Sequence, residues 1–125
     1  MQFASVRLVT KQLDALVDFY SALTGAQANR PAPPFAEFRL TGATLAISDE
    51  SVIAQFNAGA AVAGANRSAL IEFQVDDVSA VAQRLPEGTR VVMPPTTMPW
   101  RNLSMLIHDP DGNVINIFSR PASLQ

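Results

Sequence analysis

Asn116 is the residue whose chemistry first needs explaining, because it interrupts the apolar run Val114–Phe118. The stretch just before it, DPDGN at 109–113, consists of turn-forming residues, so the apolar run is predicted to be a β-strand. Side chains alternate across a strand, which puts Asn116 on one face with Val114 and Phe118. A carboxamide in that setting either faces a cavity or water, or must find hydrogen-bond partners. The local sequence leaves both interpretations open.

Arg7 and Glu72 are the charged candidates for a binding role. Each lies in an alternating segment that is predicted to be a strand, ASVRLVT for Arg7 and LIEFQVDD for Glu72. Strand parity places Ser5 beside Arg7 on one face, and Leu70 beside Glu72 on the matching face of the second segment. Two interpretations stay open. The two charges form a partly solvated ion pair worth no more than about 1 kcal/mol, or they hold a substrate.

Trp100 and Phe35 are the aromatic candidates, since each is predicted to lie where a Pro-rich loop meets a strand. Trp100 is the only tryptophan and lies in TMPWRN, and Phe35 takes the equivalent place in APPFAE. Large flat side chains at two such junctions can enclose an organic ligand. The competing interpretation is that both rings fill the rim of a barrel or a dimer contact, because most buried aromatic residues serve packing.

His108, the only histidine, abuts Asp109 at the start of the predicted turn. A histidine there is expected to titrate in water or to hydrogen-bond a neighbour. We favour this interpretation over a role as metal ligand or general base, because one histidine does not form such a site alone.

The composition is that of a folded domain that needs no covalent cross-links. Of 125 residues, 48% are hydrophobic and 16% are charged, and the formal net charge is −2, which indicates a globular chain with no nucleic-acid partner. The lack of cysteine excludes disulfides and thiolate metal sites. No apolar run is long enough to span a bilayer, and the first residues do not resemble a signal peptide, so we expect a soluble, cytoplasmic protein without a membrane partner.

A repeated order of elements organises the whole chain. Each half is predicted to be strand, helix, strand, strand, strand, and a shift of about 65 residues aligns the apolar positions of the first strand and helix. Gly25 is expected to end the first helix, and Asp77 and Gly88 to begin and end the second. We therefore predict an α+β fold of two modules, approximately 1–57 and 68–125, joined by the Ala/Gly-rich linker NAGAAVAGANRS.

Three segments interrupt this pattern. RPAPP at 30–34 and PPTTMP at 94–99 are predicted to be loops, because proline removes a backbone donor from a strand. SVIAQF at 51–56 is too short to assign to a helix or a strand.

The repeat, the helix sequences LDALVDFYSALTG and VDDVSAVAQRL, and the ending DPDGNVINIF resemble the vicinal oxygen chelate superfamily. This superfamily includes glyoxalase I, extradiol dioxygenases, fosfomycin-resistance enzymes and bleomycin-resistance proteins. The resemblance covers essentially the whole chain. It implies two βαβββ modules whose strands curl into a cup-shaped mixed sheet, with the helices outside and the ligand inside. In enzymatic members a divalent metal sits in the cup, held by His, Glu or Gln on the first and last strands of the modules.

The resemblance places these ligand positions of the present chain at Ser5, Ala46, Leu70 and Asn116. Divalent metals of this kind require imidazole or carboxylate ligands, which the four residues do not supply. Metal-binding relatives carry a Glu at the position of Asn116. The resemblance therefore implies the fold without the metal, and no cofactor is expected.

Residues and resemblance together predict a metal-free protein that binds a small organic molecule in the cup, as drug-sequestering resistance proteins do. The alternative is an enzyme of the same superfamily, a lyase, isomerase or dioxygenase with an atypical metal site or with Glu72 as a base. Whether the chain is an enzyme stays open, and no catalytic residue is assigned. Relatives of this size usually pair, so a homodimer is expected. The predicted ligand-binding residues are Ser5, Arg7, Phe35, Glu72, Trp100 and Asn116.

Overall fold

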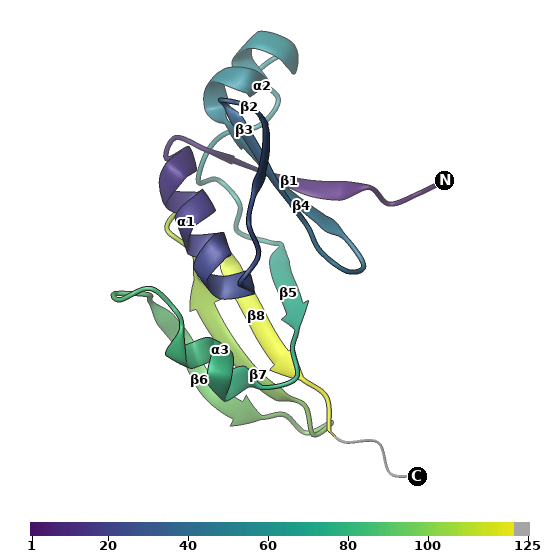
Figure 1. Ribbon diagram of the computed structural model, residues 1–125, viewed down its shortest axis with the longest axis vertical. Coiled ribbons are helices and arrows are strands. Elements are labelled where there is room, and N and C mark those ends of the chain that lie inside the picture. Colours follow the sequence, from purple (N-terminus) through teal and green to yellow (C-terminus); the bar gives the residue numbers. More distant parts are fainter. Residues whose placement is uncertain (122–125) are drawn as a thin grey trace. The chain divides into compact units, whose positions relative to one another are not determined.

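Two compact units, Met1–Ala65 and Asn66–Gln125, make up the chain, and each contains one four-stranded mixed sheet (Figure 1). The structure is a computed structural model that describes residues 1–121. The first unit consists of β1 (Ser5–Thr10), α1 (Leu13–Thr24), β2 (Asn29–Ala32), β3 (Phe35–Arg39), β4 (Thr44–Asp49) and α2 (Glu50–Phe56). The second consists of β5 (Leu70–Gln74), α3 (Val78–Gln83), β6 (Val91–Thr97), β7 (Leu103–His108) and β8 (Val114–Ser119). None of the helices in residues 1–121 has the length and apolar character that a membrane crossing requires.

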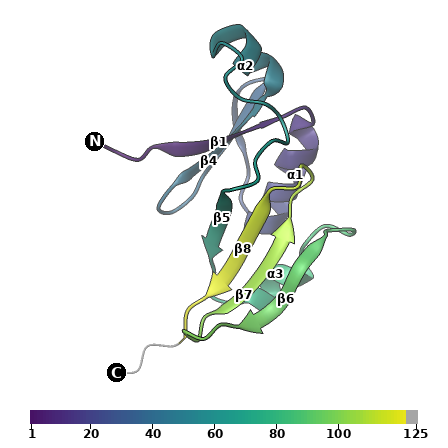
Figure 2. The ribbon, with the colours of Figure 1, turned by 180° about the vertical axis from the view of Figure 1, so that it is seen from behind.

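The two sheets share one strand order and one set of directions. The first runs β1-β4-β3-β2 and the second β5-β8-β7-β6. In each unit the first and last strands pair in parallel, and the other neighbours are antiparallel; Figure 2 shows β8 between β5 and β7. Parallel partners cannot be joined by a tight turn, so the helix and the two strands between them form the connection. The predicted order of strand, helix, strand, strand, strand is confirmed in both halves.

Local capping signals set two of the predicted helix ends and the start of a helix that was not assigned from the sequence. α1 ends at Gly25, whose φ of 72° lies in the left-handed region that glycine adopts without strain. The carboxylate of Asp77 accepts a hydrogen bond from the backbone N–H of Ala80, 3.1 Å away, and so caps the start of α3. Asp49 caps α2 in the same way through the N–H of Ser51, which shows that the unassigned segment 51–56 is helical.

The end of α3 was predicted wrongly. The helix stops at Gln83, and Gly88 lies in a later turn with a φ of 83°. Pro86 explains the early stop, because proline lacks a backbone N–H and disfavours the helical conformation of the residue before it. The glycine therefore serves the turn into β6 rather than the helix.

The predicted Pro-rich loops are wrong in part, because residues 30–32 and 94–97 belong to edge strands while 33–34 and 98–99 lie in turns. β2 contains Pro31, and β6 contains Pro94 and Pro95. The pairing of β2 with β3 shifts register between Asn29 and Ala32, around Pro31, and β6 shifts register against β7 around its two prolines. An edge strand tolerates proline because only one of its sides is paired.

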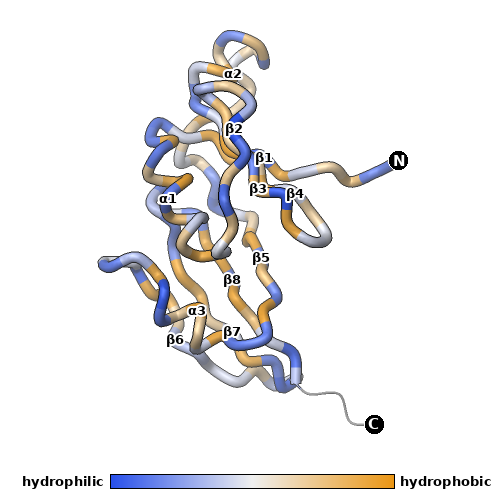
Figure 3. Tube along the Cα trace, viewed as in Figure 1, coloured by the Kyte–Doolittle hydropathy of each residue, from blue (hydrophilic) through white to orange (hydrophobic). Residues whose placement is uncertain are grey.

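The helices cover one side of each sheet with apolar side chains. In the first unit the ring of Tyr20 on α1 lies 6.4 Å from that of Phe38 on β3, and both residues are fully buried. In the second unit α3 contacts β7 and β8, and the tube of β8 is mostly orange in Figure 3. The buried apolar residues of the sheets are Leu8, Ala36, Phe38, Leu45, Ala46, Ile47, Met105, Ile107, Ile115 and Ile117.

The predicted turn between β7 and β8 is organised by one buried carboxylate. Asp109 is 4% exposed, and its Oδ1 accepts hydrogen bonds from the backbone N–H groups of Asp111 and Asn113, each at 2.9 Å. Its Oδ2 accepts a third bond from the Asn113 side chain at 2.7 Å. Gly112, with a φ of 84°, closes the turn with a bond from its N–H to the Asp109 carbonyl. A carboxylate with several donors holds the entry to β8 in one conformation.

We expect Asp109→Ala to lower the free energy of unfolding by about 1–3 kcal/mol, because buried donors of the turn lose their acceptor. Urea unfolding followed by circular dichroism measures this loss. The matched control is Asp14→Ala, whose side chain is 87% exposed and pairs with Arg30 on the surface, so its effect should stay within about 0.5 kcal/mol. Equal effects of the two substitutions would contradict the structural role of Asp109.

Candidate functional site

Each sheet has an open face, which we define as the side whose residues alternate with those facing α1 or α3. Since strand residues alternate, the register of paired strands arranges the open-face residues in rows of three. In the first sheet the rows are Ser5–Thr44–Arg39, Arg7–Ala46–Glu37 and Val9–Ser48–Phe35. In the second sheet they are Leu70–Val114–His108, Glu72–Asn116–Leu106 and Gln74–Phe118–Ser104.

The rows place Arg7 and Glu72 at equivalent positions, as the repeat predicts. Arg7 lies beside Ala46 on the neighbouring strand, and Glu72 lies beside Asn116. Ser5 and Leu70 are also equivalent, one row away. Five of the six predicted ligand-binding residues therefore lie on the open face of their own sheet, and Trp100 does not.

Glu72 and Asn116 form a hydrogen-bonded pair in the middle row of the second sheet. The Asn116 Nδ2 donates to Glu72 Oε2 over 2.8 Å. The other end of the carboxamide, Oδ1, is buried and has no hydrogen-bond partner among residues 1–121. An unpaired buried oxygen costs about 1–3 kcal/mol, so stability does not explain the choice of asparagine here. Of the two interpretations, the hydrogen bond from Nδ2 to Glu72 supports the one in which the amide finds a partner, and the oxygen has none among residues 1–121.

The open face of the first sheet keeps its charges in local hydrogen bonds. Arg7 donates from Nη2 to the side-chain oxygen of Asn57, just after α2, over 2.9 Å. Glu37 accepts from Asn29 Nδ2 at 3.0 Å and from Arg39 Nε and Nη2 at 2.9 and 2.7 Å, all at Oε1. The bond from Asn29, followed by that from Arg39, lowers the pKa of Glu37 below its usual value. Glu37 thus stays ionised on the same face as Arg7.

Glu37 and Arg39 were missed as candidates. The alternation in FAEFR places Phe35, Glu37 and Arg39 on one face, and this pattern was the available signal. Their partner Asn29 lies in a segment adjoining the predicted loop at 30–34, so the cluster depends on a strand pairing that the sequence did not indicate.

Trp100 lies in the turn between β6 and β7 and is 64% exposed. The turn is closed by a bond from the Arg101 N–H to the Met98 carbonyl, and Arg101 adopts a φ of 76°. The proposed equivalence of Trp100 and Phe35 is wrong, because the register gives Ser104 as the counterpart of Phe35. The exposure of Trp100 is that of a surface ring rather than a packed one.

His108 behaves as the local interpretation predicts. Its Nδ1 lies 2.9 Å from the carbonyl oxygen of Gly112 in the adjoining turn. A carbonyl oxygen only accepts, so Nδ1 carries the hydrogen in this bond and Nε2 is the remaining ring nitrogen. The register also places His108 on the open face, at the end of the row that begins with Leu70.

The residues at the four superfamily ligand positions do not fit a divalent metal. Ala46 and Leu70 carry no donor atom, Ser5 offers a neutral hydroxyl, and Asn116 offers one neutral oxygen. Within residues 1–121, no three His, Asp or Glu side chains cluster in a way that could hold an ion. Zinc and the other divalent metals bind through several imidazole or carboxylate ligands, so no step is assigned to a metal here.

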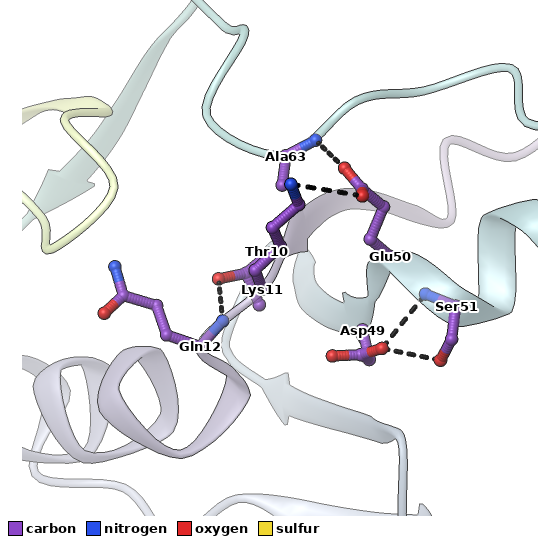
Figure 4. Close-up of polar contacts among 7 residues, drawn as sticks. All are labelled: Thr10, Lys11, Gln12, Asp49, Glu50, Ser51 and Ala63. Carbon is purple, nitrogen blue, oxygen red and sulfur yellow. Dashed lines mark hydrogen bonds and ion pairs between the residues drawn. The ribbon is translucent and has the colours of Figure 1, made fainter.

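A shallow hollow of about 580 Å³ in the first unit is a second possible site. It is lined by Lys11, Gln12, Leu13, Asp14, Ala15, Arg30, Pro33, Pro34 and Asp49. Its charges are paired, since Arg30 contacts Asp14 at 3.2 Å and Lys11 contacts Glu50 at 3.8 Å. Figure 4 shows that Glu50 also accepts from the backbone N–H of Ala63, at 2.8 Å. Through these contacts Glu50 holds the segment after α2 against the end of β1, so its role is structural.

Asp49 is the remaining charge of this region. The hydroxyl of Ser51 and then its backbone N–H, both drawn in Figure 4, lower the pKa of Asp49 below its usual value. The ionised carboxylate therefore serves α2 as its cap.

Similar proteins share this fold over nearly all of the chain. A glyoxalase-related enzyme from Fulvimarina pelagi is 25% identical, with a TM-score of 0.83, and the match covers 96% of this chain and 88% of that one. A glyoxalase/bleomycin resistance protein/dioxygenase from Nocardioides is 24% identical, with a TM-score of 0.76 over 100% of this chain and 90% of that one. TioX from Micromonospora sp. ML1 is 18% identical, with a TM-score of 0.74 and coverage of 97% and 100%.

No curated protein matches the sequence. The family model of the Glyoxalase/Bleomycin resistance protein/Dioxygenase superfamily matches residues 2–117. The repeated βαβββ order, the parallel pairing of first and last strands and this match agree, and the chain belongs to the Glyoxalase/Bleomycin resistance protein/Dioxygenase superfamily.

Proposed function

We propose that the protein binds a small organic molecule on the open face of its second sheet, without a metal ion. The observation that carries the proposal is the middle row Glu72–Asn116–Leu106. This row contains the hydrogen-bonded pair Glu72–Asn116 and the buried Asn116 oxygen, which has no partner in the described part of the chain. Small-molecule sites combine a mostly apolar surface with a few polar groups. The apolar neighbours on this face are Leu70, Leu106, Val114 and Phe118.

The first sheet supplies a different surface. Arg7 and Glu37 already have partners within the unit, and Ala46 between them is small and buried. Phe35 lies one row away and is partly exposed. The prediction that Ser5, Arg7 and Phe35 bind a ligand therefore concerns this face by itself, and the proposed site on the second sheet does not depend on it.

An enzyme of the same superfamily is the second candidate function. It is supported by the likeness to the glyoxalase-related enzyme from Fulvimarina pelagi. Glu72 is the group that would act as base, because it is an exposed carboxylate held by Asn116. Turnover of a bound ligand, followed by mass spectrometry and abolished in Glu72→Gln, would favour this candidate over binding alone.

The purified protein is expected to hold no stoichiometric zinc, nickel, manganese or iron, because Ser5, Ala46, Leu70 and Asn116 lack charged donors. Elemental analysis by mass spectrometry after growth in metal-supplemented medium measures the content. One tightly held ion per chain would show that another set of ligands forms the site.

Asn116→Leu is expected to change the free energy of unfolding by less than about 1 kcal/mol, since it removes the unpaired oxygen and leaves Glu72 solvated. Its effect should appear instead as weaker or altered ligand binding. The matched control is Asn113→Leu, which loses bonds with Asp109 and Asn66 and should cost about 1–3 kcal/mol. A cost as large for Asn116→Leu as for the control would assign the amide a structural role.

Trp100→Ala is expected to cost less than about 0.5 kcal/mol of stability, because the ring is exposed. A packed tryptophan would cost about 3–5 kcal/mol. The sole tryptophan also reports binding, so its fluorescence should respond to one or more members of a panel of aromatic metabolites and glycopeptide-type antibiotics. Calorimetry should then show weaker binding by Trp100→Ala and unchanged binding by Phe56→Ala, an exposed aromatic of the first unit.

The proposed function would be abandoned if no member of the panel altered either the fluorescence or the NMR signals of the second sheet. Loss of folding in Trp100→Ala would replace the binding role of this ring with a packing role.

A further inference from the structure

Two neighbouring rows of the second sheet's open face hold three hydrogen-bond acceptors: the Glu72 carboxylate, the Asn116 amide oxygen and a ring nitrogen of His108. We propose that the molecule bound there is a planar aromatic cation, of the amidine or guanidine class, whose N–H groups bind Glu72. The inference rests on the proposed function and deepens it by naming the ligand class. It is carried by Glu72, Asn116 and His108 in two neighbouring rows.

Glu72 is an exposed carboxylate without an ion pair in the described part of the chain. Asn116 Nδ2 donates a hydrogen bond to Oε2, and no donor within residues 1–121 reaches Oε1. The bond fixes the orientation of the carboxylate before a ligand arrives. A charged acceptor prepared in this way favours a cationic donor, and two parallel N–H groups match its two oxygens.

The other two polar groups add acceptors. Asn116 Oδ1 is buried, can only accept, and has no hydrogen-bond partner among residues 1–121, so it adds no donor to the face. His108 donates through Nδ1 to the Gly112 carbonyl, so Nε2 is the ring nitrogen that is left to accept a hydrogen bond. Glu72 and His108 lie on the two strands that flank β8, in neighbouring rows, so their backbones are about 10 Å apart across the sheet and about 7 Å apart along it. A ring with an extended substituent spans this diagonal of about 12 Å.

A guanidinium already lies on this face at its far end. The Arg120 guanidinium carbon is 5.9 Å from the centre of the Phe118 ring, and Nε donates to Gln74 Oε1 over 3.3 Å. Arg120 is thus engaged one row away from Glu72 and has no ion pair with it. The contact shows that a planar cation fits the apolar surface of these strands, since cations are attracted to the face of an aromatic ring. Leu70, Leu106 and Val114 offer an aliphatic surface around Glu72, against which the apolar ring of such a ligand can pack.

Three probes of equal shape and different charge test the inference: benzamidine, benzamide and benzoate. Each is titrated to about 10 mM into the ¹⁵N-labelled full chain at pH about 7.5, where an ordinary imidazole is mostly neutral. Benzamidine is expected to shift the Asn116 side-chain amide and the His108 ring signals saturably, about tenfold more tightly than benzamide. Benzoate is expected not to saturate these signals.

Glu72→Gln supplies the decisive comparison, because it keeps the shape of the side chain and removes its charge. It should weaken benzamidine about tenfold and change benzamide by less than about twofold. The matched control is Glu87→Gln, an exposed glutamate of the same unit outside the sheet, which should leave all three affinities unchanged. Glu72→Ala repeats the test if the Gln variant spectrum is not that of a folded chain.

The inference is overturned if benzamide or benzoate binds as tightly as benzamidine, if Glu72→Gln leaves the preference intact, or if benzamidine does not saturate. None of these outcomes decides the proposed function, which depends on the wider aromatic panel. Binding of a neutral or anionic member of that panel to this face would keep the function and reject the cation.

Discussion

Parallel pairing of the first and last strands of each module is the constraint on which the rest of the structure depends. It makes β4 and β8 inner strands with partners on both sides, and it requires the helix-containing connection that covers one face. A residue on an inner strand can point only to the helix side or to the open face. Ile47 and Ile117 fill the first, and Ala46 and Asn116 the second. A carboxamide on β8 is therefore held at the centre of a row, where its neighbours are fixed by register.

The two modules share one strand arrangement but have different side chains on their open faces. The helix side of both sheets is apolar, so the differences lie on the open faces. In the first module Arg7 is bound by Asn57, and Glu37 by Asn29 and Arg39, so the charges are largely satisfied within the unit. In the second module the middle row holds one carboxylate and one incompletely bonded amide. Unsatisfied polar groups are a common mark of a site that a ligand completes.

The periodicity of apolar residues and the turn-forming residues were sufficient to predict the two modules, the faces of the strands and the turn before β8. Arg7 and Glu72 could be predicted to occupy equivalent positions because the alternating pattern is preserved when the two halves are aligned. The extent of β2 and β6 across their prolines could not be read from the sequence, because proline excludes a central strand but not an edge strand, and edge position is a property of the assembled sheet. The Glu37 cluster was missed for the same reason, since Asn29 reaches Glu37 only through the β2–β3 pairing. Trp100 was matched to Phe35 wrongly because the β2–β3 turn, Pro33–Pro34, is shorter than the turn at 98–102.

The prolines of the two edge strands also govern how the sheets can grow. Consecutive strand residues direct their N–H groups to opposite sides, so Pro94 and Pro95 remove one donor from each side of β6. The missing inner donor coincides with the register shift against β7, and the missing outer donor leaves a gap in the row that a further strand would need. Pro31 likewise removes a donor from β2, the edge strand of the first sheet. Addition of a further strand is therefore disfavoured at these two edges. The same prolines that made the strands hard to recognise in the sequence thus protect these edges against amyloid-like stacking.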